Sequence, residues 1–243
     1  MKANFTFLVT MLLFVGLFSS CTAIGETIKP SKNLITRDYK VKDFNQIEAT
    51  TVGDIYYTQS TDGKTSVQIY GPDNFINLIQ VAVKNGTLLL TMEKHNKVKN
   101  GKLKITISSP DLNRIDFKGV GDIYVDNSFK TANLDIESKG VGDIKINDLT
   151  CDALTVSSMG VGDVVLKGKV QSAILSSKGV GDINAEELET SRIDASSKGV
   201  GDISCYATES LKASVKGVGS IRYKGNPTEK SFEKGGVGSI KSL

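Results

Sequence analysis

The sequence predicts an all-β fold, a parallel β-helix in which coils of about 20 residues stack along one axis. Three observations support this prediction. The tripeptide Gly-Val-Gly, followed by Asp or Ser and then Ile or Val, occurs seven times, and successive starts lie 18 to 21 residues apart. Apolar residues recur at every second position on both sides of each motif. After the first 20 residues, no segment shows the apolar spacing of a helix.

Each Gly-Val-Gly motif is predicted to form a sharp corner between two strands. Glycine suits a corner because it adopts positive φ and lets backbones approach closely. The valine between the glycines is the same in all seven copies, and we expect it to point inward and fill the corner. The predicted corner glycines are Gly119, Gly121, Gly140, Gly142, Gly160, Gly162, Gly179, Gly181, Gly199, Gly201, Gly217, Gly219, Gly236 and Gly238.

The strands beside each corner are predicted from an apolar period of two, which leaves one face buried. Aliphatic residues such as Ile136 and Val156 stand four positions before a motif, and Ile144 stands four positions after one. A second corner, at Leu149 or Leu188, begins a third side of the coil. Coils that stack at about 4.8 Å would make seven motifs a rod of roughly 30 Å.

Two other solenoids have related periods. A leucine-rich repeat needs the run Leu-x-x-Leu-x-Leu-x-x-Asn, which this chain lacks. A calcium-binding nonapeptide roll needs Gly-Gly-x-Gly-x-Asp at half the period, whereas here Asp directly follows the second glycine. The β-helix is therefore the preferred solenoid.

Residues 35–118 are predicted to form less regular β-helix coils that continue without a linker into the regular repeats of residues 119–243. The segment contains several short predicted strands, and Asn85-Gly86 between two of them predicts a β-hairpin. The 68 residues from Thr51 to Gly119 leave room for about three coils with insertions.

Residues 1–20 are predicted to be a lipoprotein-type signal peptide, followed by a tether over residues 21–34. The apolar run after Lys2 is too short to span a membrane. Its end, Leu-Phe-Ser-Ser-Cys, resembles a bacterial lipoprotein cleavage site, which implies cleavage before Cys21 and a lipid on that residue. The alternative is ordinary secretion with an incidental cysteine. We expect an outer-membrane lipoprotein of the cell envelope, facing the periplasm or the surface.

The charge of the mature chain argues against a nucleic-acid binder. Removing the leader removes one of 30 basic residues and none of the 27 acidic ones, so the net charge falls from +3 to +2. Cys205 falls on an inward position and Cys151 near a corner, roughly 14 Å apart along the stack. This distance exceeds the reach of a disulfide, so we expect two reduced, structural cysteines.

An acid follows the second glycine in most copies, and stacking would align these carboxylates in a ladder about 5 Å apart. Adjacent charges at that distance repel by roughly 3 kcal/mol at an effective dielectric of 20. Lysines that precede the corners, such as Lys139 and Lys178, and hydrogen bonds from corner amides would offset this repulsion. The functional alternative is a glycan or a cation such as Ca²⁺ on the ladder. The ladder residues are Asp122, Asp143, Asp163, Asp182 and Asp202.

No pattern in the sequence predicts catalysis. The ladder carboxylates have nearly identical surroundings, whereas acid–base catalysis needs two groups whose pKa values differ. The single histidine, His95, lies in a basic loop and is expected to be solvated. The chain lacks a Ser-His-Asp set, zinc-ligand spacing, a phosphate loop and tryptophan; Tyr56 and Tyr124 are among the substitutes for a sugar platform. No cofactor is expected.

Several segments together resemble the putative auto-transporter adhesin, head GIN domain family. They are Tyr-Lys-Val-Lys-Asp-Phe-Asn-Gln-Ile at residues 39–47, Val-Gly-Asp-Ile at residues 52–55, Asn74, and the repeated Gly-x-Gly-Asp-Ile. The likeness covers about residues 35–240. It implies an exported protein of the kind found mostly in Bacteroidetes, and a right-handed β-helix similar in shape to pectin lyases but without their catalytic residues. Ser220 and Ser239 depart from the family pattern and argue against a metal site along the whole ladder.

The sequence therefore predicts a non-catalytic, lipid-anchored envelope protein with an adhesin-like role, which the family resemblance implies. Its expected partners are the membrane, through the lipid, and a glycan, matrix component or envelope protein. One alternative is a periplasmic structural or assembly protein that forms homo-oligomers through the solenoid end. A polysaccharide lyase or hydrolase is the less favoured alternative, because fold alone does not give function.

Overall fold

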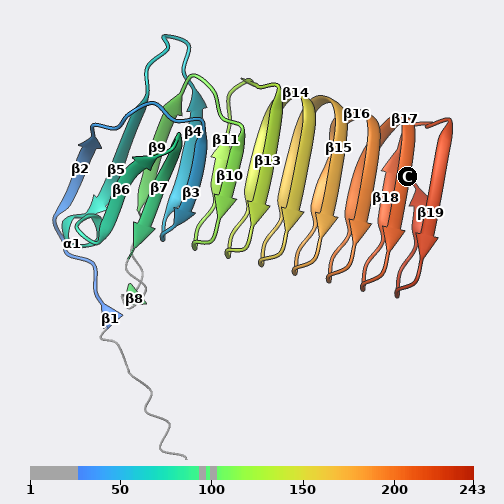
Figure 1. Cartoon of the computed structure of the whole chain (residues 1–243). Coiled ribbons are helices and arrows are strands. Elements are labelled where there is room, and N and C mark those ends of the chain that lie inside the picture. Colours follow the sequence, from blue (N-terminus) through green and yellow to red (C-terminus); the bar gives the residue numbers. More distant parts are fainter. Residues whose placement is uncertain (1–26, 93–96, 99–102) are drawn as a thin grey trace, which may run out of the picture.

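A computed structural model describes residues 27–92, 97–98 and 103–243. Strands make up most of these residues and stack into one elongated solenoid (Figure 1). The predicted parallel β-helix is therefore confirmed. The predicted signal peptide, Cys21 and His95 lie outside the described residues.

The regular part of the solenoid is a stack of parallel coils. In β14 to β17, one long strand runs from one Gly-Val-Gly corner to the next, and in β14 its register shifts between Ile146 and Leu149. Leu149 pairs with Phe129 before it and with Gly168 after it, so the second corner does begin a third side. The strands of this part are β10 (Arg114–Phe117), β11 (Ile123–Val125), β12 (Phe129–Lys130), β13 (Asn133–Ser138), β14 (Ile144–Ser158), β15 (Val164–Ser177), β16 (Ile183–Ser197), β17 (Ile203–Val215), β18 (Ile221–Lys224), β19 (Glu229–Lys234) and β20 (Ile240–Ser242).

The core runs the length of the solenoid as columns of stacked side chains. Equivalent positions of successive coils pair in register, as Ile136 does with Val156 and Val156 with Leu175, and all three are fully buried. The serines two positions before four of the corners are also buried and point inward: Ser138, Ser158, Ser177 and Ser197. Each coil thus buries its inward face against its neighbours, and burial of apolar surface is the main source of stability.

The corner valines point outward, so the prediction that they fill the corner is wrong. Val161 and Val180 are about half exposed (51% and 52%), and bridges join each corner valine to the valine of the next coil. The reason is the strand alternation, which continues through the corner. Counting back by twos from the buried Ile183, the glycines occupy the inward positions and the valine an outward one.

The N-terminal part departs from the predicted succession of coils. β3 pairs in parallel with both β7 and β10, and β4 pairs in parallel with both β9 and β11. The coil made by β3 and β4 therefore lies between β7–β9 and β10–β11, out of chain order. β5 and β6 are antiparallel to their partners, so about three successive coils do not form here. The elements are β1 (Thr27–Ile28), β2 (Leu34–Tyr39), β3 (Gln46–Thr50), β4 (Asp54–Gln59), β5 (Ser66–Pro72), α1 (Asp73–Ile76), β6 (Ile79–Lys84), β7 (Thr87–Met92), β8 (Lys97–Val98) and β9 (Lys104–Ser109).

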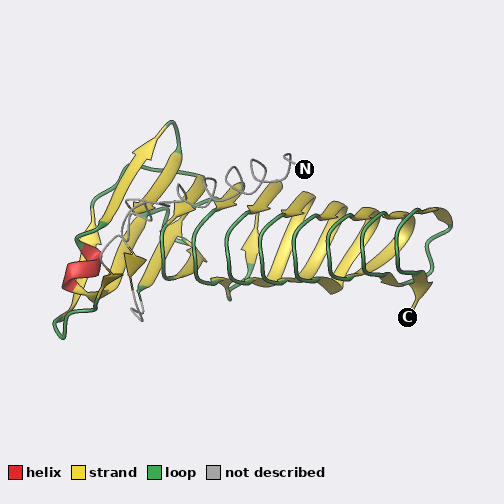
Figure 2. Cartoon of the chain, turned by 90° about the horizontal axis from the view of Figure 1, so that it is seen from below, coloured by secondary structure: helices red, strands yellow, loops and turns green. Residues whose placement is uncertain are grey.

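Of the two local predictions for this part, the hairpin is confirmed and the absence of a helix is wrong. The predicted hairpin is confirmed: β6 and β7 are antiparallel, and Asn85 (φ 50°) and Gly86 (φ 76°) form its turn. The expectation of no helix is wrong by one turn, α1, which lies near the N-terminal end of the stack (Figure 2). The Asp73 carboxylate accepts a hydrogen bond from the Ser31 hydroxyl at 2.6 Å, which fastens this turn to the segment before β2.

Candidate functional site

The aspartates after the corners form the predicted ladder, and hydrogen bonds hold it together. One carboxylate oxygen of each aspartate accepts the backbone N–H of the equivalent residue in the next coil. The Asp143 amide donates to Asp122 Oδ1 at 2.8 Å, and the Asp163 amide donates to Asp143 Oδ1 at 2.9 Å. The same bond joins Asp182 to Asp163 and Asp202 to Asp182. The carboxylates therefore serve as side-chain caps for amides at the corners.

Serine takes over this role at the end of the ladder. The Ser220 amide donates to Asp202 Oδ1 at 2.7 Å, and the Ser239 amide donates to the Ser220 hydroxyl at 3.1 Å. What the position requires is a hydrogen-bond acceptor, which either residue supplies. Among the described residues, no group of three or more His, Cys, Asp or Glu side chains is placed to hold a metal ion. The proposal of a cation on the ladder thus gains no support from its geometry.

Among the described residues, two aspartates of the ladder form ion pairs, and neither pairs with a lysine that precedes a corner. Lys145 forms an ion pair with Asp143 at 3.0 Å, and Arg222 pairs with Asp202. The hydrogen bond from the Asp163 amide, more than the Lys145 ammonium, lowers the pKa of the Asp143 carboxyl below its ordinary value.

Replacing Asp143 separates the two roles of its carboxylate. Asp143→Asn keeps an oxygen for the Asp163 amide but loses the pair with Lys145, and exposed pairs contribute about 0.2–1 kcal/mol. Asp143→Ala also removes the hydrogen bond from the Asp163 amide, and such a bond contributes about 0.5–1.5 kcal/mol. We therefore expect Asp143→Ala to lower the free energy of unfolding by clearly more than Asp143→Asn, measured by urea denaturation. Equal losses in the two variants would contradict the capping role.

Acid should destabilise the protein through the carboxyls whose pKa values folding lowers. Besides Asp143, these include Glu137 and Glu233, whose pKa values fall mainly through hydrogen bonds from Lys139 and Lys216. A lowered folded pKa stabilises the fold above the unfolded value, and that contribution is lost as the pH falls through the folded value. The ordinary values are 3.8 for Asp and 4.5 for Glu. We expect the urea midpoint to be level near neutral pH and to fall below about pH 4.5. A midpoint that rises below pH 4 would contradict this assignment.

The lysines before the corners form a separate row, and most of them pair with acids on the adjacent outward strand position. Lys118 contacts Glu48 at 3.0 Å and Asp116 at 2.9 Å. Lys139 contacts Glu137 at 2.6 Å, and Lys216 contacts Glu233 at 2.9 Å. The expectation that this row neutralises the aspartate ladder is therefore wrong, because the lysine side chains turn toward the strand face.

Two lysines in the middle of the row differ from the others. At Lys178 and Lys198 the neighbouring outward positions hold Ser176 and Ser196, which pair with each other across the strands. Within the described part of the chain, neither lysine forms an ion pair within 4.0 Å. The centre of the row therefore carries two cationic groups without an acidic partner.

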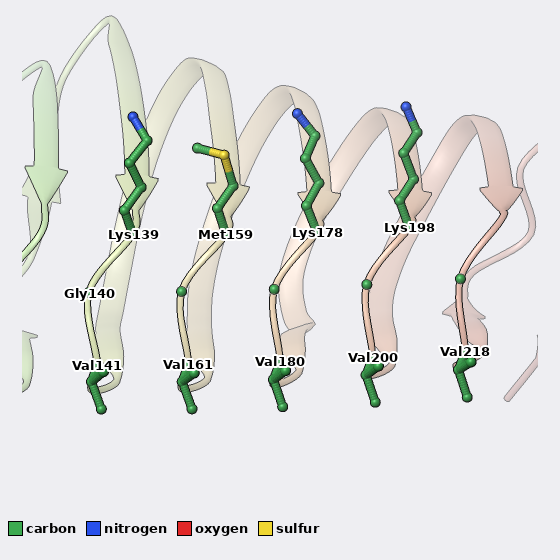
Figure 3. A pocket seen from close by; sticks show the side chains of 14 residues that line it. Lys139, Gly140, Val141, Met159, Val161, Lys178, Val180, Lys198, Val200 and Val218 are labelled. Carbon is green, nitrogen blue, oxygen red and sulfur yellow. The ribbon is translucent and has the colours of Figure 1, made fainter. Parts of the chain in front are cut away.

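A shallow groove of about 640 Å³ runs along the corners between the lysine row and the valine row (Figure 3). Its floor is the stacked first glycines of five corners, Gly140 to Gly217. The lysine side chains and the valine side chains diverge from this floor, and Met159 replaces lysine in one coil. Glycine is required because a Cβ on Gly179 would meet the carbonyl oxygen of Gly160 in the preceding coil. The groove is thus a direct product of the repeat.

The tyrosines considered as sugar platforms are used differently. The rings of Tyr56 and Tyr124 stack at 5.0 Å on the outward face of β4 and β11. Lys104 lies over the Tyr56 ring at 4.6 Å and Lys145 over the Tyr124 ring at 5.6 Å. Lysines thus lie over both rings of the stack, and this pair is no open platform for a sugar.

Both described cysteines are free and buried. Burial raises the pKa of Cys151 and of Cys205 to about 12 in each case. A thiol with a raised pKa is a poor nucleophile at neutral pH, so these side chains act as small apolar residues of the core. Among the described residues, no helix has the length and apolar character needed to cross a bilayer.

Comparison with known proteins agrees with this architecture. The model of the family described as putative auto-transporter adhesin, head GIN domain, matches residues 43–227. A crystal structure of a putative adhesin from Bacteroides fragilis is 64% identical, with a TM-score of 0.88 over 89% of this chain and 100% of that chain. The family resemblance seen in the sequence is confirmed. No curated protein gave a significant match.

Two more distant crystal structures share the fold. One, described as a putative lipid binding protein from Parabacteroides distasonis, is 24% identical, with a TM-score of 0.72 over 90% of this chain and 100% of that chain. The other, a putative adhesin from Parabacteroides merdae, is 22% identical, with a TM-score of 0.69 over 90% of this chain and 99% of that chain. At these identities the likeness supports the solenoid fold alone.

Proposed function

The chain belongs to the putative auto-transporter adhesin, head GIN domain family, and we propose that it is a non-catalytic adhesion module of the bacterial cell envelope. A lipid on Cys21 would hold it at the outer membrane. The corner edge of the solenoid, defined here as the valine row, the lysine row and the groove between them, would be the contact surface.

The observation that carries this proposal is the exposed valine row. The corner valines from Val120 to Val218 are each about half exposed, between 51% and 54%, and they follow one another without interruption along one edge. Single exposed apolar residues are ordinary, but a continuous strip with a polar border is typical of interaction surfaces. Packing does not explain a valine at every one of these positions, since their side chains lie outside the core.

The chemistry of the edge favours binding over catalysis. The ladder carboxylates repeat the same hydrogen bond in every coil, which commits one oxygen of each to holding the corner of the next coil. A repeated surface instead offers many equivalent weak contacts, and linked weak contacts give high avidity. An extended ligand lying along the edge would engage several coils together.

Exposure on intact cells tests the proposal. We expect added protease to cleave the native protein on intact cells and antibody to label it there, with lysed cells as the control. Cells that lack the protein should adhere less to glycan-coated or matrix-coated surfaces, and the wild-type gene should restore adherence. Protection of the protein until the cells are lysed would contradict an adhesive role.

A further inference from the structure

We propose that the groove binds a linear anionic polysaccharide, aligned with the solenoid axis, and that Lys178 and Lys198 bind its acidic groups. This inference rests on the proposed adhesive function and names the class of ligand. Its starting point is the contrast between these two lysines and the rest of their row.

The residues three positions before the first glycine of each corner face outward and form a column across the coils, beside the lysine row. This column changes from acidic residues to serines in the middle of the solenoid. At both ends it holds acids, Glu137 on one side and Glu233 on the other, and these pair with the neighbouring lysines. Between them the column is serine, in register across four coils: Ser157, Ser176, Ser196 and Ser214. Lysine charge is therefore neutralised by the protein at the ends of the row and left available at its centre.

The serines supply hydroxyl groups beside these charges. Ser214 donates to Glu233 at 3.3 Å. In the described structure, the half-buried Ser157, Ser176 and Ser196 form no side-chain hydrogen bond like that one. Ammonium and hydroxyl groups in one patch match the carboxylate and hydroxyl groups of an acidic sugar. Moreover, Lys178 and Lys198 are one coil apart and repel each other, and an anion between them would remove that repulsion.

The shape of the groove favours a linear polymer over a small anion. It extends over five coils and repeats at the coil spacing of about 4.8 Å, close to the length of one sugar unit in an extended chain. Its valine wall and Met159 present C–H surface, which suits the faces of sugar rings. The groove is also open, so an acyl chain lying in it would stay largely in contact with water.

A peptide strand fits the groove less well. The amides of the floor are already committed to neighbouring coils: Val180 donates to the Gly160 carbonyl at 2.9 Å, and Gly162 donates to the Val180 carbonyl at 3.0 Å. An added strand would therefore find no free amide there, although free amides are what edge pairing needs. In addition, side chains on one face of a strand recur about every 6.8 Å, which does not match the coil spacing.

The experiment compares two hexasaccharides that differ only in charge. One is β-1,4-linked glucuronic acid and the other is its carboxyl-reduced form, a neutral glucose oligomer. Calorimetric titration into the purified mature protein should show binding of the acidic form only. The double variant Lys178→Gln/Lys198→Gln should weaken this binding about tenfold, as expected for the loss of two exposed ion pairs. Lys169→Gln, which removes an exposed lysine that is paired with Glu189 and does not line the groove, is the matched control and should change affinity less than about twofold.

The outcomes separate this inference from the proposed function. Equal binding of both oligosaccharides, or an unchanged affinity in the double variant, would overturn the role of the two lysines. Binding to anionic phospholipid vesicles but not to the acidic hexasaccharide would assign the same charges to a lipid surface and would also overturn it. If the protein binds no oligosaccharide while cells still adhere through it, the adhesive function stands and this ligand class is wrong.

Discussion

Gly162→Ala is expected to lower the free energy of unfolding by about 3 kcal/mol, through backbone strain and a steric clash. Gly162 has a φ of 135°, a conformation that residues with a side chain rarely adopt. A Cβ at this position would also meet the carbonyl of Gly142 in the preceding coil. In a chain of this size the loss corresponds to a fall in Tm of roughly 6–12 °C, which thermal unfolding followed by circular dichroism would measure.

Gly235→Ala is the matched control for this substitution. Gly235 also lies beside a corner, but no atom lies within 4 Å of a Cβ built there. Its replacement should leave the Tm within about 2 °C of wild type, as for most surface changes. A Gly162→Ala protein as stable as Gly235→Ala would show that the coils do not stack as closely as the structure describes.

The second large effect is expected from the core. Leu175 is fully buried, and Leu175→Ala should cost about 2–5 kcal/mol through lost apolar burial and the cavity left behind. Val180, five residues along the same coil, is 52% exposed, and Val180→Ala should cost no more than about 0.5 kcal/mol. The comparison is made by urea denaturation of the two variants under the same conditions.

This pair of variants decides the orientation of the corner valines. A loss of more than about 1.5 kcal/mol for Val180→Ala would be expected of a buried valine and not of an exposed one. The outward orientation, and with it the corner edge as a binding surface, would then be wrong.

The sequence predicted the regular part of the fold because the same local pattern repeats. The 18-to-21-residue period fixes the coil, the alternation of apolar residues fixes the strands, and Asn85-Gly86 fixes the hairpin. The orientation of the valines was also readable from the sequence. Counting by twos from Ile183 or Ile144 places each corner valine outward, and an invariant valine is therefore not by itself a sign of burial.

Other features could not be read from local patterns. The coil of β3 and β4 lies between strands that come later in the chain, because several strands of similar composition compete for the same pairing. Which acid each lysine contacts depends on side-chain direction across neighbouring coils. Lys139 turns toward Glu137 on the strand, while Lys145 takes the place beside Asp143 that Lys139 was expected to fill.

The most direct test of the adhesive corner edge is the adherence of cells that display the triple variant Val161→Ser/Val180→Ser/Val200→Ser. Its control is Ile174→Ser, which removes an equally exposed apolar residue (54%) from a strand face outside the groove. Surface levels and Tm are matched first. The structure predicts that the triple variant loses most of its adherence while Ile174→Ser keeps it. Full adherence of the triple variant, or equal losses in both, would contradict the assignment of the corner edge as the binding surface.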